Sequence, residues 1–229
     1  MNDHAHDLAA LREATDRLLS ATEKLDDAAL AGPSRLPGWS RNHVVAHLSR
    51  NADALVNVLR GRAMYADSET RDRDIERDAL RPRAEQLADL AASAERFMAA
   101  AAVPADWSRT VELRNGVTDS ASRIPFRRWA EVDLHHVDLG IGYELEDLPE
   151  EFTAREIDFL AERFAGHPSV PSTGLADAAG RTWTTGGGAE GGPVGVRGTA
   201  SELLGWLSGR RDGSALTVDG GSLPALPPL

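Results

Sequence analysis

The sequence predicts an α+β protein in which a four-helix bundle precedes a small α+β domain. Apolar residues recur at helical spacing in four segments of the first 145 residues. After Pro149 the pattern changes to short runs typical of strands, separated by glycine and proline. The chain has 229 residues and is 41% hydrophobic, which suits one or two domains with their own cores. We therefore expect the bundle over residues 1–147 and the second domain over residues 148–229.

Two helices are expected before residue 61. The first spans about Asp7 to Leu30, where apolar positions recur at spacings of three, four and seven residues. Gly32 breaks this pattern. The second helix runs from about Arg41 to Arg60, with Ser40 as its N-cap and Gly61 at its end.

Two further helices complete the predicted bundle. One fits about Arg83 to Ala102, and the other begins at Pro125 and runs to about Leu139. Residues 66–83 are dense in charge, which is typical of a solvated loop or of a solvent-facing helix. Residues 105–123 predict irregular or weakly extended chain. Four amphipathic helices with connections of varied length are the pattern of a four-helix bundle.

The predicted C-terminal domain combines helices with strands. A helix fits residues 151–165, and β-like runs follow at residues 181–185, 194–197 and 215–218. The glycine-rich segment 186–192 is predicted to be a hairpin loop, because it lacks the Gly-Lys-Ser/Thr ending of a phosphate-binding loop. Thr199 or Ser201 is expected to cap a short helix that ends at Leu207.

The composition excludes several classes of function. The net charge of −11 disfavours binding to nucleic acid and to anionic membranes, which needs clustered cations. No apolar run is long enough to span a bilayer, and the first residues lack the features of a signal peptide, so we expect a soluble cytoplasmic protein. The chain has no cysteine, which excludes disulfides, a cysteine nucleophile and cysteine-bound zinc. Any thiol chemistry must therefore use a thiol that a cofactor brings.

Histidine and glutamate recur at helical spacing on two of the predicted helices. His43 and His47 are four residues apart on the second helix, as are Glu131 and His135 on the fourth. His47, Glu131 and His135 would then project into one core, and this ligand set suits zinc and other divalent metals. Three protein ligands leave an open position, which is typical of a catalytic site. The same spacing also arises in ordinary surface pairs, and His43 and His136 are rival ligands, so spacing alone leaves both interpretations open.

Two motifs resemble those of the mycothiol-dependent maleylpyruvate isomerase family. The first, residues 36–48, reads LPGWSRNHVVAHL and resembles the opening of the family's second helix. The second, residues 131–140, reads EVDLHHVDLG and resembles its fourth-helix motif. The resemblance covers most of the chain and implies a DinB-like bundle followed by a small sterol-carrier-like α+β domain. It also implies that His47, Glu131 and His135 bind the metal, that the metal is zinc, and that the thiol cofactor is mycothiol.

The resemblance further implies an activity in aromatic catabolism, the conversion of maleylpyruvate, a small dianion, to fumarylpyruvate. A metal-activated thiolate would add to the cis double bond, and rotation followed by loss of the thiol would give the trans isomer. Arg71 and Arg210 match the family's functional arginines, with Arg211 as the neighbouring alternative to Arg210. Guanidinium groups suit this role because they bind carboxylates in bidentate fashion.

Two other functions fit the same residues. A mycothiol S-transferase would keep the metal and join the thiol to an electrophilic metabolite or toxin. A binding module without turnover would sequester a metal or a small ligand. The matched Arg71 and Arg210 favour the isomerase, because its substrate carries two carboxylates.

Overall fold

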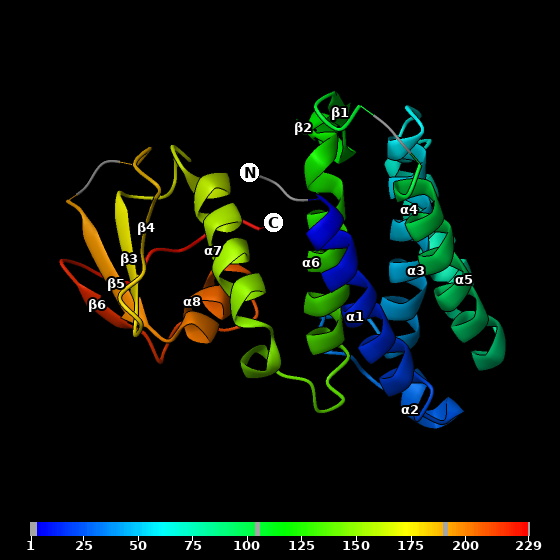
Figure 1. Ribbon diagram of the computed structural model, residues 1–229. Helices are drawn as coiled ribbons and strands as arrows, with labels where there is room; N and C mark the ends of the chain where they lie inside the picture. The colour runs from blue at the N-terminus through cyan, green and yellow to red at the C-terminus, as the bar shows by residue number, and fades with distance from the viewer. Residues whose placement is uncertain (1–3, 104–105, 190–191, 229) are drawn as a thin grey trace. The chain divides into compact units, whose positions relative to one another are not determined.

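The chain divides into two compact units between Tyr143 and Glu144. The computed structural model describes residues 4–103, 106–189 and 192–228 of the protein. The first unit is helical apart from one small hairpin, and the second combines helices with a four-stranded sheet (Figure 1). The predicted α+β class is therefore confirmed.

Four long helices form the first unit, as predicted (Figure 1). They are α1 (His4–Thr22), α3 (Arg41–Leu59), α5 (Arg83–Ala101) and α6 (Ile124–Asp138). α3 packs against α5 and α6, and α1 packs against α6 and α5, so that the four helices share one core. Buried Leu11, Leu48, Leu90 and Phe97 contribute to that core. The contact between α3 and α6 brings together the two helices that carry the sequence motifs.

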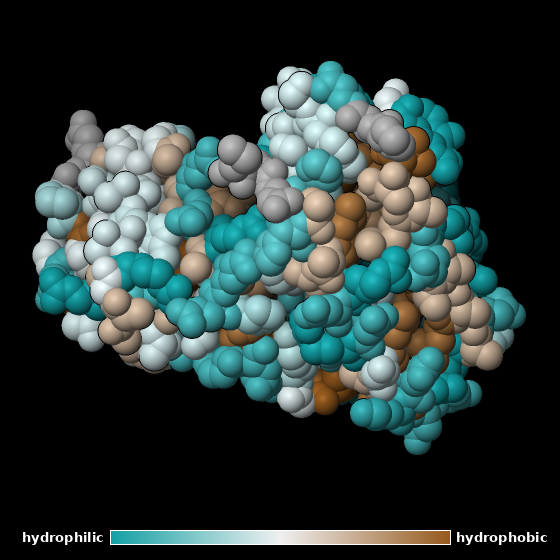
Figure 2. Space-filling model, in the orientation of Figure 1, coloured by the Kyte–Doolittle hydropathy of each residue, from teal (hydrophilic) through white to brown (hydrophobic). Residues whose placement is uncertain are grey.

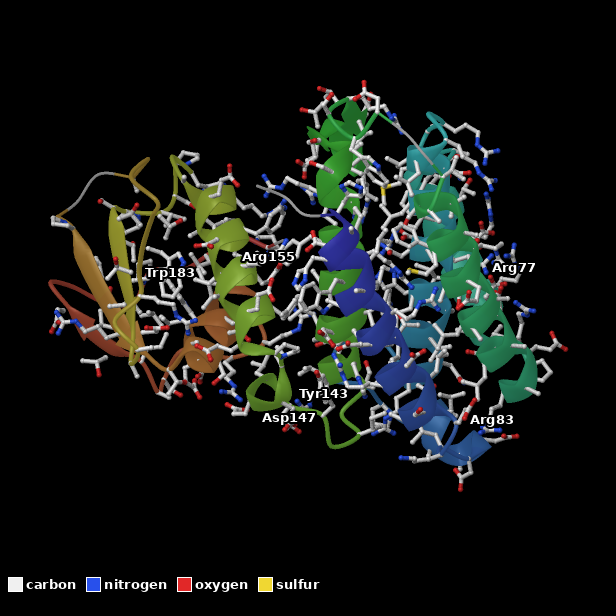
Figure 3. The ribbon with its side chains drawn as sticks, viewed as in Figure 1. Arg77, Arg83, Tyr143, Asp147, Arg155 and Trp183 are labelled. Carbon is white, nitrogen blue, oxygen red and sulfur yellow. The ribbon has the colours of Figure 1, made fainter. Side chains whose placement is uncertain are left out.

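The predicted helix over residues 7–30 is wrong in one respect, because it is interrupted. A separate short helix, α2 (Asp27–Ala31), follows the end of α1. Asp26 starts α2, since its carboxylate accepts a hydrogen bond from the backbone N–H of Ala29 at 2.7 Å. Arg83, which lies beside α2 in Figure 3, fixes the turn by donating to two of its backbone carbonyl oxygens, at 2.6 and 2.7 Å.

The charge-dense segment forms a helix, α4 (Ser68–Ala79), which is one of the two alternatives that its composition left open. Asp67 caps the first turn by accepting a hydrogen bond from the backbone N–H of Thr70 at 2.6 Å. Ile75 is buried together with Ala46 of α3, so α4 covers one side of α3. Most charged residues of the helix are exposed or partly exposed, whereas Asp78 is buried and pairs with Arg50 of α3.

A small hairpin lies within the segment predicted to be irregular or weakly extended. β1 (Thr110–Glu112) pairs antiparallel with β2 (Thr118–Ser120). Arg109 anchors the hairpin to the end of α3, because its Nη2 donates to the carbonyl oxygens of the last two residues of that helix at 3.0 and 2.7 Å. Residue 105, which belongs to the same predicted segment, lies outside the described residues.

The second unit is a four-stranded sheet with two helices packed against it. Its elements are α7 (Glu150–Phe164), β3 (Thr173–Asp177), β4 (Thr182–Thr185), β5 (Val194–Gly198), α8 (Ala200–Leu207) and β6 (Thr217–Asp219). The strand order is β4-β3-β5-β6, with β3 and β5 parallel and the other pairs antiparallel. Trp183 of β4 donates a hydrogen bond to Asp158 of α7 (Figure 3). Thr199, one of the two predicted caps, starts α8 by accepting a hydrogen bond from the N–H of Glu202.

The glycine-rich segment is not a hairpin loop, and this prediction was wrong. β3, which the sequence analysis did not predict, lies between β4 and β5, so the segment passes the end of β3. Gly186 permits this path, because its φ is 68° and a Cβ there would lie 2.0 Å from the carbonyl oxygen of Pro171. Residues 190 and 191 of the segment lie outside the described residues.

Hydrophilic side chains cover most of the face shown in Figure 2, in keeping with the net charge of −11. The hydrophobic patches between them are small and separate. Within the described residues, no helix combines the length and the apolar character that crossing a membrane requires.

Candidate metal centre

The starts of α3 and α6 fix where the side chains of these helices point. The backbone N–H of Ser40 donates to Nδ1 of His43 at 3.2 Å, which closes the first turn of α3. Pro125 occupies the first turn of α6, where its missing N–H costs no helical hydrogen bond. His47 of α3 and Glu131 of α6 then face each other across the contact between the two helices.

Three side chains meet between α3 and α6. Nε2 of His47 lies 3.0 Å from Oε2 of Glu131, and Nε2 of His135 lies 3.3 Å from the same oxygen. The two imidazole rings meet edge to face, with their centroids 4.6 Å apart. One ligand atom from each residue lies within 4.8 Å of the other two. Among the described residues, this is the one group of three histidine, aspartate or glutamate side chains that has such a geometry.

Burial and hydrogen bonding set the charges of the three residues. Burial lowers the pKa of His47 to about 4, against the opposing effect of its hydrogen bond with Glu131. Burial alone would raise the pKa of Glu131, but hydrogen bonds with His135 and His47 outweigh it and hold this pKa well below its usual value. Burial lowers the pKa of His135, but hydrogen bonds with Asp138 and Glu131 outweigh it and raise this pKa. The Glu131 carboxylate is therefore charged at neutral pH, although its side chain is one-third exposed.

Further residues hold the two imidazole rings in place. Oδ2 of the buried Asp138 lies 2.8 Å from Nδ1 of His135, which keeps a proton on Nδ1 and turns Nε2 toward the cluster. Nη2 of Arg71, from α4, lies 3.3 Å from Nδ1 of His47. The ring of Trp39 lies 5.5 Å from the ring of His47, between centroids.

This arrangement fits a divalent metal ion. Two imidazole nitrogens and one carboxylate oxygen are ligands that zinc accepts, and three protein ligands leave a position open. The partly buried carboxylate of Glu131 supplies the negative charge that such a site needs. The contact between Asp138 and His135 is the support that metal-binding histidines usually have. The structure thus brings together the three side chains that the sequence singled out, and metal binding by them stays a prediction.

The two rival histidines lie outside the cluster. His43 serves the first turn of α3, and its Nε2 lies 3.3 Å from Oε2 of Glu76. His136 stacks on Tyr143 with ring centroids 4.2 Å apart, and burial lowers its pKa to about 4. Both rings therefore have structural surroundings of their own, which favours His47 and His135 as the ligands.

The predicted functional arginines belong to different units. Arg71 lies in the first unit, in contact with His47 as described above. Arg210 lies in the second unit, directly after the end of α8. Its neighbour Arg211 is held by two carboxylates of the same unit, those of Glu146 and Glu202. The role of Arg210 stays a prediction, with Arg211 as its alternative.

Three residues near the cluster were missed by the sequence analysis. Asp138 follows His135 by three residues and lies within the second motif, so helical spacing and the motif could have revealed it. The phenol of Tyr65 lies in the surroundings of Glu131, and burial raises its pKa. Arg128 is buried on α6, one turn before Glu131. Tyr65 and Arg128 gave no signal, because only the folded chain brings them to the cluster.

A cavity of about 570 Å³ adjoins Tyr65. The end of α3, residues 61–67 and the β1–β2 hairpin line it, and Arg62 and Arg114 contribute cationic side chains. Tyr65 belongs both to the lining of this cavity and to the electrostatic surroundings of Glu131. Tyr65 is thus the residue that relates the cavity to the cluster.

Solved structures with the same fold carry a common name. A crystal structure of the mycothiol-dependent maleylpyruvate isomerase superposes with a TM-score of 0.89 at 24% identity, over 99% of this chain and 97% of that chain. A histidine-to-alanine mutant of the mycothiol-dependent maleylpyruvate isomerase gives a TM-score of 0.88 at 23% identity, with the same coverage. At these identities the likeness establishes the fold. No curated protein matches the chain.

Family models match both units of the chain. The model of the mycothiol maleylpyruvate isomerase N-terminal domain matches residues 11–140. The model of the C-terminal domain of the same family, abbreviated MDMPI, matches residues 147–228. Together they cover most of the sequence, including both motifs. The chain therefore belongs to the mycothiol maleylpyruvate isomerase family.

Proposed function

We propose that this protein is a metal- and mycothiol-dependent cis–trans isomerase that converts maleylpyruvate to fumarylpyruvate. The observation that carries the proposal is the convergence of His47, Glu131 and His135 in a chain of this family. The shared fold of two structures named mycothiol-dependent maleylpyruvate isomerase supports it.

The proposed metal is zinc, held by Nε2 of His47, a carboxylate oxygen of Glu131 and Nε2 of His135. Bound there, a divalent ion lowers the pKa of a thiol that coordinates it, so that a thiolate is present at neutral pH. Asp138 keeps the ring of His135 in the orientation that ligation needs. The three proposed ligands and Asp138 all lie within the helical bundle.

The thiol is proposed to come from bound mycothiol, because the chain has no cysteine. Bound mycothiol would supply the thiol group for reversible addition to the cis double bond of the substrate. The cavity beside Tyr65, of about 570 Å³, has the size of a pocket for a small cofactor. We assign the thiol cofactor to this cavity on the ground of its size and of the position of Tyr65.

Arg71 is proposed to bind one carboxylate of the substrate. A guanidinium group only donates hydrogen bonds, so its contact with Nδ1 of His47 requires that nitrogen to be unprotonated. When His47 ligates a metal through Nε2, its neutral ring carries the proton on Nδ1 instead. Nη2 of Arg71 would then have no acceptor on His47 and could donate to a substrate carboxylate, while Nη1 pairs with Asp72 at 2.6 Å.

Arg210 is also proposed to act on the substrate, as the resemblance to the family implies. The resemblance to the family supports this role for Arg210, with Arg211 as the alternative. Replacement of each arginine in turn by methionine distinguishes the two. Loss of maleylpyruvate turnover in Arg210→Met, with Arg211→Met less affected, is the expected result.

The deciding experiment is an assay of the purified, zinc-loaded protein with maleylpyruvate, with and without mycothiol. Formation of fumarylpyruvate should require the thiol and should stop when a chelator removes the metal. No turnover by a protein that still holds zinc would reject the isomerase. A subsequent assay with electrophilic acceptors of mycothiol would then test the S-transferase alternative.

A further inference from the structure

Arg128 lies one helical turn from the metal cluster. It precedes Glu131 by three residues on α6, so the two side chains lie on neighbouring parts of one face. Its Nη1 donates to the side-chain oxygen of Asn51 at 2.8 Å. Asn51 in turn follows His47 by four residues on α3. The pair of Arg128 and Asn51 thus repeats, one turn along the same helix contact, the facing arrangement of Glu131 and His47.

Arg128 is a buried cation whose only close partner is neutral. The residue is 2% exposed, and it is one of the largest fully buried side chains in the described part of the protein. Among the described residues, no carboxylate lies within ion-pair distance of its guanidinium, and Asn51 is its one hydrogen-bond partner. Two arginines adjacent to this pair in the sequence do have carboxylate partners, since Arg50 pairs with Asp89 and Arg127 pairs with Asp119.

Such burial is costly unless an anion compensates for it. Removing a charged group from water costs several kcal/mol, and a neutral amide returns only part of that. Burial lowers the pKa of Arg128 to about 10, and the carboxylates of Glu131 and Asp53 and the phenol of Tyr65 oppose this shift from longer range. The group therefore still carries its charge at neutral pH. The side chain of Asn51 accepts a hydrogen bond from one of the five N–H donors of the Arg128 guanidinium. A carboxylate bound in bidentate fashion accepts from two such donors.

We propose that Arg128 is a substrate-binding residue, which holds one carboxylate of the dicarboxylate beside the metal cluster. This proposal rests on the proposed function, since it assigns a position to a substrate of that site. Arg71 from α4 and Arg128 from α6 then provide two guanidinium groups within the first unit. The bundle itself selects for a substrate with two carboxylates, and Asn51 positions the Arg128 fork.

The alternative is that Arg128 only stabilises the contact between α3 and α6. In that case its replacement would change folding or metal content but would not discriminate between ligands with one and two carboxylates. Binding of maleate and of crotonate separates these possibilities, because maleate carries two carboxylates and crotonate carries one. The two acids also differ in double-bond geometry, so each affinity is compared between variants and not between acids. Neither ligand requires mycothiol or turnover.

The experiment is calorimetric titration of the zinc-loaded, full-length protein with maleate and with crotonate. The variants are Arg128→Met, Arg128→Lys and, as a control, Arg12→Met, which removes an exposed arginine that pairs with Glu95. Maleate should bind about tenfold or more weakly to Arg128→Met, because a charge-assisted contact is lost. Crotonate affinity should change less, Arg128→Lys should be intermediate, and Arg12→Met should match the wild type. Zinc content and circular dichroism are measured on each variant.

Unchanged maleate affinity in a zinc-loaded Arg128→Met protein would overturn the proposal, as would equal losses for maleate and crotonate. If Arg128→Met does not fold, the same comparison in Arg128→Lys decides, and loss of zinc from that variant would make Arg128 a structural residue. The two proposals fail separately. A protein that does not turn over maleylpyruvate but binds maleate through Arg128 would lose the isomerase assignment and keep the dicarboxylate site.

Discussion

At the scale of single residues, the two ring nitrogens of His135 have different partners and different roles. Nδ1 faces Asp138 at 2.8 Å, whereas Nε2 faces Glu131 at 3.3 Å. His47 has the same division, with Arg71 at Nδ1 and Glu131 at Nε2. For His135 this is the support that metal ligands usually have, because an acceptor holds the proton on Nδ1. Arg71 only donates hydrogen bonds, so its contact with Nδ1 of His47 belongs to the metal-free form of that ring.

The ligand assignment predicts opposite results for two histidines of α3. His47→Ala should abolish stoichiometric zinc binding, because it removes one of three protein ligands. His43→Ala should keep zinc and lose some stability, because His43 closes the first turn of the helix. Metal analysis of dialysed proteins measures both effects. Full zinc content in His47→Ala, or zinc loss in His43→Ala alone, would reject the assignment.

The support of His135 predicts a graded effect. Asp138→Asn removes the charge behind Nδ1 while keeping the size of the side chain. Zinc affinity should fall about 10- to 100-fold, which is the usual effect of losing such a partner. Competition with a chromogenic chelator measures the affinity. An affinity equal to that of the wild type would show that Asp138 does not support the ligand.

At the scale of elements, the helices were predictable and their interruptions were not. The periodic apolar positions of α3, α5 and α6 indicate their limits to within about two residues, the usual disagreement at helix ends. The break before α2 depends on one local contact of Asp26, which competes with an otherwise continuous pattern. β3 has the sequence TGLAD, which lacks a run of β-branched residues, and its place in the sheet comes from pairing with distant strands.

The residues of the site also differ in whether a local sequence pattern or the tertiary fold determines their positions. The ligand spacing on α3 and α6 is local, so the sequence could indicate the cluster. Arg71 was found through the family motif, since its helix gave only a pattern of charge. Arg128 and Tyr65 depend on how α3, α6 and the loop after α3 meet, which no local pattern encodes. Sequence reasoning therefore found the ligands and missed much of their surroundings.

The cap of α4 predicts an effect on the site through the helix that carries Arg71. Asp67→Ala removes the acceptor of the Thr70 N–H bond, so the first turn of α4 should fray. Hydrogen exchange of the amides in that turn should become faster, and turnover should fall while zinc content stays constant. Asp67→Ser keeps an acceptor and should behave like the wild type. Unchanged exchange in Asp67→Ala would show that the cap does not hold this turn.

The turn between β3 and β4 predicts a dependence of stability on pH. Burial raises the pKa of Asp177, but hydrogen bonds from Arg181 and from the backbone N–H of Ala179 outweigh it and lower this pKa. A lowered pKa stabilises the folded state above the unfolded value of about 3.9, and this stabilisation is lost as the pH falls through the folded pKa. Wild type should therefore exceed Asp177→Asn in stability at neutral pH, and the difference should shrink in acid. Urea unfolding at several pH values measures it, and a difference independent of pH would contradict the charge argument.

At the scale of the whole molecule, the proposed ligands all belong to one of the two units. Zinc should therefore stabilise the first unit directly, because it binds the folded cluster and the unfolded chain holds no such site. At a free zinc concentration 100-fold above the dissociation constant, the stabilisation is about 2.7 kcal/mol. The contribution should appear where the ligands are, along α3 and α6.

Hydrogen exchange of the full-length protein with and without zinc tests this distribution. Peptides from α3 and α6 should gain the most protection, because exchange from the bundle core requires the cluster to open. Peptides from β3, β5 and β6 should change least, since their hydrogen bonds lie in the second unit. His47→Ala should show no response to zinc in either unit. If zinc protected both units equally in the wild type, the two would open as one cooperative body, and metal bound in the bundle would also control the stability of the unit that carries Arg210.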